Sequence, residues 1–369
     1  MDDFAKEENI SMPDTPSPRP AAPPPQKRGV SFWILALLSV VLILSVIANL
    51  VLMVLLGVCA GMAGGITTDE DKPGYNESFV MGDDQSKNKV LEIAINGVIF
   101  EDEESFRSRD NIVVRVRSEL KAAKKDKEIK ALLVTVDSPG GGITASDVLW
   151  SEIKNYREKE KIPVIAYCKD VTASGGYYVA SMADYIMAHE TSLVGNIGVI
   201  AEFINVKGLC QKIGIDMNVI KSETFEGKES VKDIGNPFRE MKPAERKLLQ
   251  NIINEMWDNF VDVVAEGRKG KLTRKDVEKL ADGTIYSGKG ALEKKLIDGL
   301  GYKEDAFEKA KELAKLKDAK LVKYKSRLSP LQELLFSRMN EPASLRLVPD
   351  LKETLRGQSP QLLYLWTME

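Results

Sequence analysis

The chain has 369 residues, of which 43% are hydrophobic and 29% charged, and its formal net charge is −3. This weakly acidic balance argues against nucleic acid as a partner, because contacts to phosphates need a basic surface. With one histidine and three cysteines, no His/Cys cluster has metal-ligand spacing, so we expect no metal site and no cofactor.

The N-terminal segment 1–28 is rich in proline and polar residues, so we expect it to be disordered and cytoplasmic. No charged residue then occurs from Gly29 to Thr68, and residues 30–59 are almost wholly apolar. This run exceeds the roughly 20 residues that a bilayer-spanning helix needs, which predicts one transmembrane helix. A cleaved signal peptide is the alternative, although its apolar region is normally shorter and closer to the start.

The charges that flank the span predict its orientation. Lys27 and Arg28 precede it, whereas Asp69, Glu70 and Asp71 follow it. Because basic flanks stay in the cytoplasm, we expect a single-pass protein of the cell (inner) membrane with its bulk on the extracytoplasmic side. Lipidation at Cys59 is not expected, because the preceding residue is Val58 rather than a small residue.

Beyond the span, residues 60–88 are expected to be a tether, 89–325 one globular domain and 326–369 a C-terminal tail. Strand-like and helix-like segments alternate in the domain, which predicts the α/β class. The expected strands are 90–95, 131–136, 163–168, 184–188 and 197–200, and the expected helices are 146–158, a short one ending at 182, and 242–267.

Ser174 follows an expected strand and begins a short helix, within the segment 172–178 (Thr-Ala-Ser-Gly-Gly-Tyr-Tyr). Small neighbours allow a sharp turn and a close substrate, and a helix N-terminus offers free N–H donors to a developing oxyanion. This environment suits a nucleophile. A plain N-cap serine explains the segment equally well.

The segment 137–142 (Asp-Ser-Pro-Gly-Gly-Gly) also lies between a buried strand and a helix, where α/β folds bind ligands. Its bare backbone N–H groups suit an oxyanion hole, and the spacing fits neither a Walker motif nor Gly-x-Gly-x-x-Gly. An ordinary turn is the alternative interpretation.

The sequence offers few candidates for the general base that would activate Ser174. His189 is the one histidine, and at a strand end we expect it to be structural. A lysine serves as base once burial or neighbouring dipoles lower its pKa, and Lys232 lies 58 residues after Ser174. Local sequence alone does not indicate that Lys232 is buried.

Four segments together give the chain a family resemblance: 137–142, 173–178, 195–199 (Gly-Asn-Ile-Gly-Val) and 232–237 (Lys-Asp-Ile-Gly-Asn-Pro). In this order and downstream of one span, they resemble the signal peptide peptidase A family in its short, single-domain form. The resemblance covers about residues 89–325.

The resemblance implies a serine endopeptidase with a Ser/Lys dyad and the Clp-protease/crotonase-like fold, a spiral of ββα units. It implies Ser174 as nucleophile, Lys232 as general base, and the N–H groups of Gly141 and Gly175 as the oxyanion hole. It further implies a homo-oligomer whose dyad is shared between subunits. The expected substrates are remnant signal peptides and similar apolar peptides, cleaved at the extracytoplasmic face of the lipid bilayer.

One departure from the family pattern concerns the base. The loop 223–231 before Lys232 is long and acidic, so Lys228 is an alternative base. A displaced loop is also compatible with a non-catalytic membrane scaffold or quality-control adaptor on the same fold. A crotonase-like acyl-thioester enzyme is a third reading, but it explains neither the Ser/Lys pair nor the anchor.

The remaining features are two cysteines and an apolar end. We expect Cys168 and Cys210 to be buried free thiols. The residues 362–366 (Leu-Leu-Tyr-Leu-Trp) are apolar, and we expect them to dock on a neighbouring subunit or the membrane surface. The alternative is that this tail docks on its own body or imitates a substrate.

Overall fold

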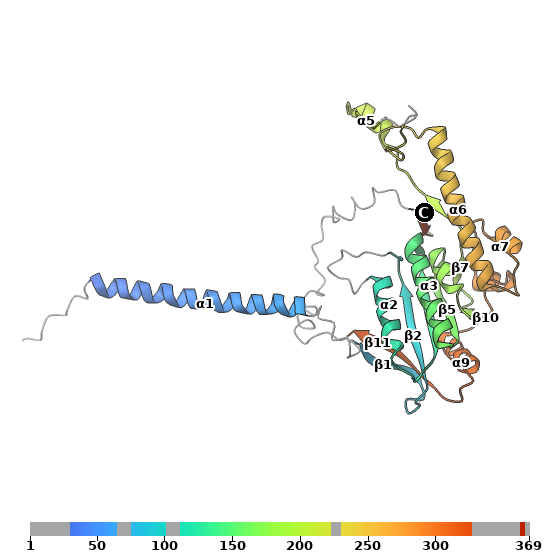
Figure 1. Cartoon of the computed structure of the whole chain (residues 1–369), viewed down its shortest axis with the longest axis horizontal. Helices are drawn as coiled ribbons and strands as arrows, with labels where there is room; N and C mark the ends of the chain where they lie inside the picture. Colours follow the sequence, from blue (N-terminus) through green and yellow to red (C-terminus); the bar gives the residue numbers. More distant parts are fainter. Residues whose placement is uncertain (1–29, 65–74, 101–110, 223–229, 327–361, 366–369) are drawn as a thin grey trace, which may run out of the picture. The chain divides into compact units, whose positions relative to one another are not determined.

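The computed structural model describes residues 30–64, 75–100, 111–222, 230–326 and 362–365 (Figure 1). The chain divides into two compact units, Met1–Lys72 and Pro73–Glu369. In the first unit, helix α1 spans Val30–Gly64. Within it, Trp33–Val54 is the one stretch of the described residues long and apolar enough to cross a bilayer, by length and composition.

The second unit is a mixed α/β structure around a central sheet, with strand order β1-β11-β2-β3-β5-β6-β10 and with β7 and β9 attached beside β5. Its strands are β1 Tyr75–Gly82, β2 Lys89–Asn96, β3 Ile129–Ser138, β5 Val164–Ala173, β6 Tyr185–Ala188, β7 Leu193–Gly195, β9 Ile285–Ser287, β10 Gly299–Leu300 and β11 Lys320–Ser326. The strands from β11 to β10 pair in parallel, and β1 closes the edge antiparallel to β11.

The helices of this unit are α2 Ile112–Ala123, α3 Ile143–Glu160, α4 Gly175–Ala180, α5 Lys207–Ile213, α6 Pro243–Gly267, α7 Arg274–Leu280, α8 Gly288–Glu293 and α9 Lys303–Leu313. Helices α2 and α3 pack on one face of the sheet and α9 on the other, whereas α5 lies away from the sheet (Figure 1). A smaller sheet has the order β4-β12-β8, with β4 Gly140–Gly142, β8 Ile200–Ala201 and β12 Leu362–Leu365.

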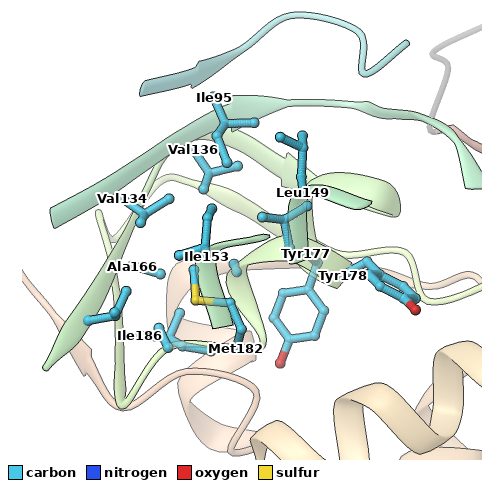
Figure 2. Packing of buried hydrophobic residues seen from close by; sticks show 14 of the residues in the cluster. Ile95, Val134, Val136, Leu149, Ile153, Ala166, Tyr177, Tyr178, Met182 and Ile186 are labelled. Atoms are coloured by element: carbon cyan, nitrogen blue, oxygen red, sulfur yellow. The ribbon is translucent and has the colours of Figure 1, made fainter. Parts of the chain in front are cut away.

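The apolar run of β3 is buried on both faces because successive side chains point to opposite sides of a strand. Leu132, Val134 and Val136 join the larger core, whereas Ala131 and Leu133 join a second core under α9. Figure 2 shows side chains of α3 and of the sheet meeting in the larger core. The run therefore behaves as the sequence predicts for a doubly covered parallel strand.

Two parts of the expected element map differ from the structure. Residues 75–82, expected within the tether, form β1 and pair with β11, so the folded unit begins before residue 89. The strand expected at 197–200 is not formed: residues 197–199 lie between β7, which ends at Gly195, and the short β8, which contains only Ile200 of the expected range. The cause lies at Asn196, whose φ is 51° and whose side-chain amide donates to the Gly283 carbonyl at 2.6 Å, so the chain turns away from the sheet.

Candidate active site

Ser174 occupies a sharp turn between the end of β5 and the start of α4. Its φ is 53° and its ψ −119°, a combination that residues with a Cβ rarely adopt. The Ser174 N–H donates to the Gly195 carbonyl at 2.8 Å, and its own carbonyl accepts from the Tyr178 N–H at 2.8 Å. Strained backbone of this kind is concentrated at functional sites, and here both flanking bonds hold it in place.

Gly175 and Gly141 lie backbone against backbone beside this turn. A Cβ added to Gly175 would be 3.2 Å from the Gly141 nitrogen and would overlap the Ser146 hydroxyl. A Cβ added to Gly141 would overlap the Ile99 carbonyl. Gly175 is the first residue of α4, where an N–H has no intrahelical acceptor. The fold thus brings together three of the four predicted site residues.

Hydrogen bonds at one edge of β4 orient the Gly141 amide. The Ile99 N–H donates to the Gly140 carbonyl and the Gly142 N–H donates to the Ile99 carbonyl, both at 2.8 Å. Backbone groups alternate in direction along an extended strand, so the Gly141 N–H faces the opposite edge of β4. In this structure that opposite edge is the one along which β12 pairs with β4.

Residues that the sequence analysis did not identify stabilise β4 and α4 through hydrogen bonds. The Ser138 hydroxyl donates to the Gly97 carbonyl at 2.6 Å and accepts from the Gly140 N–H at 3.1 Å. The phenols of Tyr177 and Tyr178 donate to the Leu296 carbonyl and Asp147, at 2.7 Å and 2.6 Å. The adjacent tyrosines were the signal in the sequence that could have identified these supporting contacts, because buried phenol hydroxyls need hydrogen-bond partners.

Burial raises the pKa of Tyr177, so this phenol stays neutral and keeps its role as a donor. The two rings lie on the side of α4 that faces the core (Figure 2). They fix the short helix whose N-terminus follows Ser174.

Within one subunit, the Lys232 side chain does not contact Ser174 through a hydrogen bond among those of the described residues. It is exposed, in a turn where its backbone N–H donates to the Ser230 hydroxyl at 3.3 Å. Among the hydrogen bonds and ion pairs of the described residues, none links its ammonium group to Ser174. The alternative base, Lys228, lies outside the described residues.

An ionic cluster anchors the turn that carries Lys232. The neighbouring Asp233 carboxylate accepts from Arg239 at 2.8 Å and from Lys221 at 2.7 Å, and Arg239 also pairs with Glu245 of α6 at 2.6 Å. The hydrogen bonds from Arg239 and Lys221 hold the pKa of Asp233 well below its usual range. The cluster therefore remains charged at neutral pH and fixes the start of this turn.

Residues 202–222 and 230–241, called the arm below, extend beyond the end of α6 in the view of Figure 1. The arm exposes many large apolar side chains, and Ile220 is 99% exposed. Apolar groups of this size and number are typical of an interaction surface. The exposed members are Ile204, Leu209, Ile213, Ile215, Met217, Val219, Ile220 and Val231.

A cavity of about 500 Å³ lies where β8, the arm and α6 meet. Its apolar lining includes Phe203, Ile204 and Leu249, and its polar lining includes Arg239 and Gln250. It is therefore a mixed pocket next to β8 rather than a closed apolar one.

The other candidate groups are structural. The His189 ring forms a hydrogen bond with the Thr191 hydroxyl at 2.8 Å and packs on the ring of Tyr302. Cys168 and Cys210 are buried free thiols, as expected, and burial raises the pKa of Cys168 to about 12. Within the described part of the chain, no group of three or more His, Cys, Asp or Glu side chains is placed to hold a metal ion.

Comparison with known proteins identifies the family. The model of "Peptidase family S49" matches residues 156–317, a range that includes Ser174 and Lys232. An Enterococcus faecium protein named as a candidate signal peptide peptidase SppA is 36% identical over 243 residues, which cover 65% of this chain and 68% of the relative.

Two further relatives match different shares of this chain and of their own length. A candidate protease of Methanocaldococcus jannaschii is 40% identical over 200 residues, 54% of this chain and 61% of the relative. Protease 4 of Haemophilus influenzae is 29% identical over 227 residues, 61% of this chain but 35% of that longer protein. In each case the match covers part of the relative and not the whole of it.

Proposed function

The chain belongs to peptidase family S49, and on that premise we propose that it is a membrane-anchored serine endopeptidase with a Ser174/Lys232 dyad. The observation that carries the proposal is the strained turn at Ser174 beside the touching backbones of Gly141 and Gly175. In the proposed reaction the Ser174 hydroxyl attacks a peptide carbonyl, whose oxyanion is bound by the two glycine N–H groups. The lysine, which has taken the serine proton, donates it to the leaving amine as the C–N bond breaks and the acyl-enzyme forms. The same lysine then takes a proton from water, which attacks the acyl-enzyme and releases the acid while Ser174 regains its proton.

In this proposal, Lys232 reaches the Ser174 of a neighbouring subunit when the subunits assemble into an oligomer. Its exposure in one chain and its position on an arm rich in exposed apolar side chains support a homo-oligomer in which one subunit's lysine serves its neighbour's Ser174. The proposed spiral of the Clp-protease/crotonase class accommodates this arrangement.

The proposed substrates are remnant signal peptides and similar apolar peptides. Helix α1 would hold the enzyme in the bilayer where such peptides are left, and apolar side chains line part of the cavity beside β8. Lys27 and Arg28 on one flank, and three acidic residues on the other, support a cytoplasmic N-terminus with cleavage on the extracytoplasmic side.

The test is fluorophosphonate labelling of the full-length protein in detergent between pH 6 and pH 10. We expect Ser174→Ala and Lys232→Met to abolish labelling and peptide turnover while the oligomer remains folded. Labelling in the wild type should rise through one alkaline transition as the lysine loses its proton. Lys228→Met is the matched control, and we expect it to remain active.

Three outcomes would alter the proposal. If the Ser174→Ala variant turned over peptide at the wild-type rate, Ser174 would be excluded as the nucleophile. If Lys228→Met inactivated the enzyme and Lys232→Met did not, Lys228 would be the base instead of Lys232. Absence of labelling in a folded, oligomeric wild type would favour a non-catalytic scaffold, with which the exposure of Lys232 in one chain is also compatible.

A further inference from the structure

Helix α6 connects the two parts of one subunit that carry the proposed dyad. Its C-terminal half contacts α4, the helix that begins immediately after Ser174, and the turn with Lys232 lies before its N-terminus (Figure 1). We infer that α6 is a lever that holds the Lys232 turn in a fixed direction relative to α4, and that Asn259 and Tyr178 are positioning residues at its pivot. The inference rests on the proposed function, because it concerns how one subunit presents its lysine to the serine of the next.

The pivot consists of Tyr178 on α4 and of Asn259 and Phe260 on α6. The Asn259 side-chain amide donates to the Tyr178 hydroxyl at 3.2 Å, and that hydroxyl donates to Asp147 of α3 at 2.6 Å. The rings of Tyr178 and Phe260 pack with their centroids 5.1 Å apart. One phenol therefore joins three helices, and it belongs to the short helix that follows the proposed nucleophile.

The C-terminal half of α6 anchors the helix in the body of the folded unit. The buried residues of this half are Phe260, Val261, Val263 and Val264. The Trp257 indole also donates to the Ala281 carbonyl at 2.7 Å. Among residues 246–259 of the helix, all of which the structure describes, none is buried in a single chain. The pivot therefore lies where α6 leaves the core, and it sets the direction of the part that extends beyond.

The N-terminus of α6 holds the Lys232 turn through the ionic cluster described above. Glu245, in the first turn of the helix, accepts from the Arg239 guanidinium at 2.6 Å and 2.7 Å and from the Lys242 backbone N–H at 2.9 Å. Arg239 also donates to the carboxylate and to the backbone carbonyl of Asp233, at 2.8 Å and 3.0 Å. Because Asp233 directly follows Lys232, the lysine turn moves together with the start of α6.

The distance between the pivot and this cluster converts a small tilt into a large displacement. Glu245 and Asn259 are separated by about four turns of helix, or about 21 Å. A tilt of about 5° at the pivot therefore shifts the start of α6, and Lys232 with it, by about 2 Å. A displacement of about 1 Å can cost about 100-fold in rate. The hydrogen bond of Asn259 thus lies where a small change in angle has a large effect on the lysine.

The experiment uses the full-length protein in detergent. Asn259→Ala removes the donor of the pivot, Tyr178→Phe removes its hydroxyl and keeps the ring, and a double variant removes both. Asn259→Gln keeps an amide donor and tests rescue. The matched control is Asn254→Ala, which removes a 2.9 Å hydrogen bond from Gln250 that lies within α6 itself. Each variant is assayed for Tm, and for kcat and KM on an apolar peptide, with active sites counted by fluorophosphonate labelling.

We expect Asn259→Ala to lower kcat about 10- to 100-fold with KM unchanged, and to lower Tm by only a few degrees, because the core contacts of α6 remain. Tyr178→Phe should lower kcat to a similar extent, and the double variant no further, because all three lose the same contact. Asn259→Gln should recover part of kcat, and Asn254→Ala should keep the wild-type value. A merely structural role would lower Tm and the number of active sites without lowering kcat per active site.

Electron cryomicroscopy of the wild-type and Asn259→Ala oligomers measures the direction of α6 whether or not the protein is active. We expect the N-terminal half of α6 to be tilted in the variant and Lys232 to be displaced by at least about 1 Å. Wild-type kcat in Asn259→Ala, or an unchanged direction of α6, would overturn the inference. A tilted helix in a protein whose wild type has no protease activity would keep the lever and refute the proposed function instead.

Discussion

Substitution of Gly141 by alanine tests the proposed oxyanion hole directly. The added Cβ would overlap the Ile99 carbonyl oxygen and lie 2.7 Å from both the Ile99 nitrogen and carbonyl carbon. These are backbone atoms held by two hydrogen bonds of 2.8 Å, so no side-chain rotation relieves the overlap. Either β4 or the segment at Ile99 must move, and the Gly141 N–H moves with β4.

The expected effect has two components. Overpacking against backbone costs about 1–3 kcal/mol of folding stability. For a domain of this size each kcal/mol corresponds to about 2–4 °C in Tm. Displacement of one oxyanion donor costs about 100- to 1,000-fold in kcat. We therefore expect Gly141→Ala to fold, to unfold at a lower temperature, and to lose most of its kcat.

The control separates the two components. Gly82 is distant from the site in β1, has a φ of 95°, and a Cβ there would lie 2.5 Å from the Ala319 carbonyl oxygen. Gly82→Ala should lower Tm to a similar extent with kcat unchanged. The assays are peptide turnover at saturating substrate and thermal unfolding by circular dichroism. Wild-type kcat in a folded Gly141→Ala would refute the assignment of its N–H to the oxyanion hole, whatever its Tm.

Three further predictions concern strain, a buried ion pair and the Lys232 turn. Ser174→Gly should be more stable than the equally inactive Ser174→Ala by about 1–3 kcal/mol in unfolding free energy, because glycine adopts φ 53° without strain; equal stability would exclude strain at this turn. Asp298→Asn should lose about 3–5 kcal/mol, because it leaves the fully buried Arg268 guanidinium without its 2.6 Å carboxylate partner. Burial tends to raise the pKa of Asp298, but hydrogen bonds from Arg268 and Lys271 lower it below its usual value. The stabilisation by this carboxylate is therefore complete above the unfolded pKa of about 4 and is lost as the pH falls further. In urea unfolding measured from pH 7 to pH 2, Asp298→Asn should lose less unfolding free energy on acidification than the wild type, and parallel curves would exclude this ion pair as a source of the acid sensitivity. Asp233→Asn should release the turn of Lys232 and lower kcat by up to about 100-fold, with the Asp233→Glu variant partly restoring it; unchanged kcat would mean that the cluster does not position the lysine.

Local sequence determined much of the framework. The run at 131–136 is long enough for a strand and has Thr135 as its one polar residue, which is why a buried parallel strand was predictable and is observed as part of β3. The glycines at 140–142 and 175–176 interrupt periodic segments, so breaks after the two strands were predictable from residue type, but in the structure residues 140–142 form the short strand β4 and residues 175–176 begin α4. The apolar N-terminal run likewise specified a membrane-spanning candidate by length and composition.

Only the tertiary structure decided which of these segments touch. The contact of Gly175 with Gly141, the pairing of β1 with β11, and the insertion of β12 beside β4 all join residues that are distant in sequence. Local periodicity carries no record of such pairs, because they form only when the backbone edges and core faces of separate elements meet. The tail illustrates this limit: its apolar residues led to the expectation that it docks on a neighbouring subunit or the membrane surface, whereas in the structure β12 pairs with β4 and β8 of its own chain, which was the alternative.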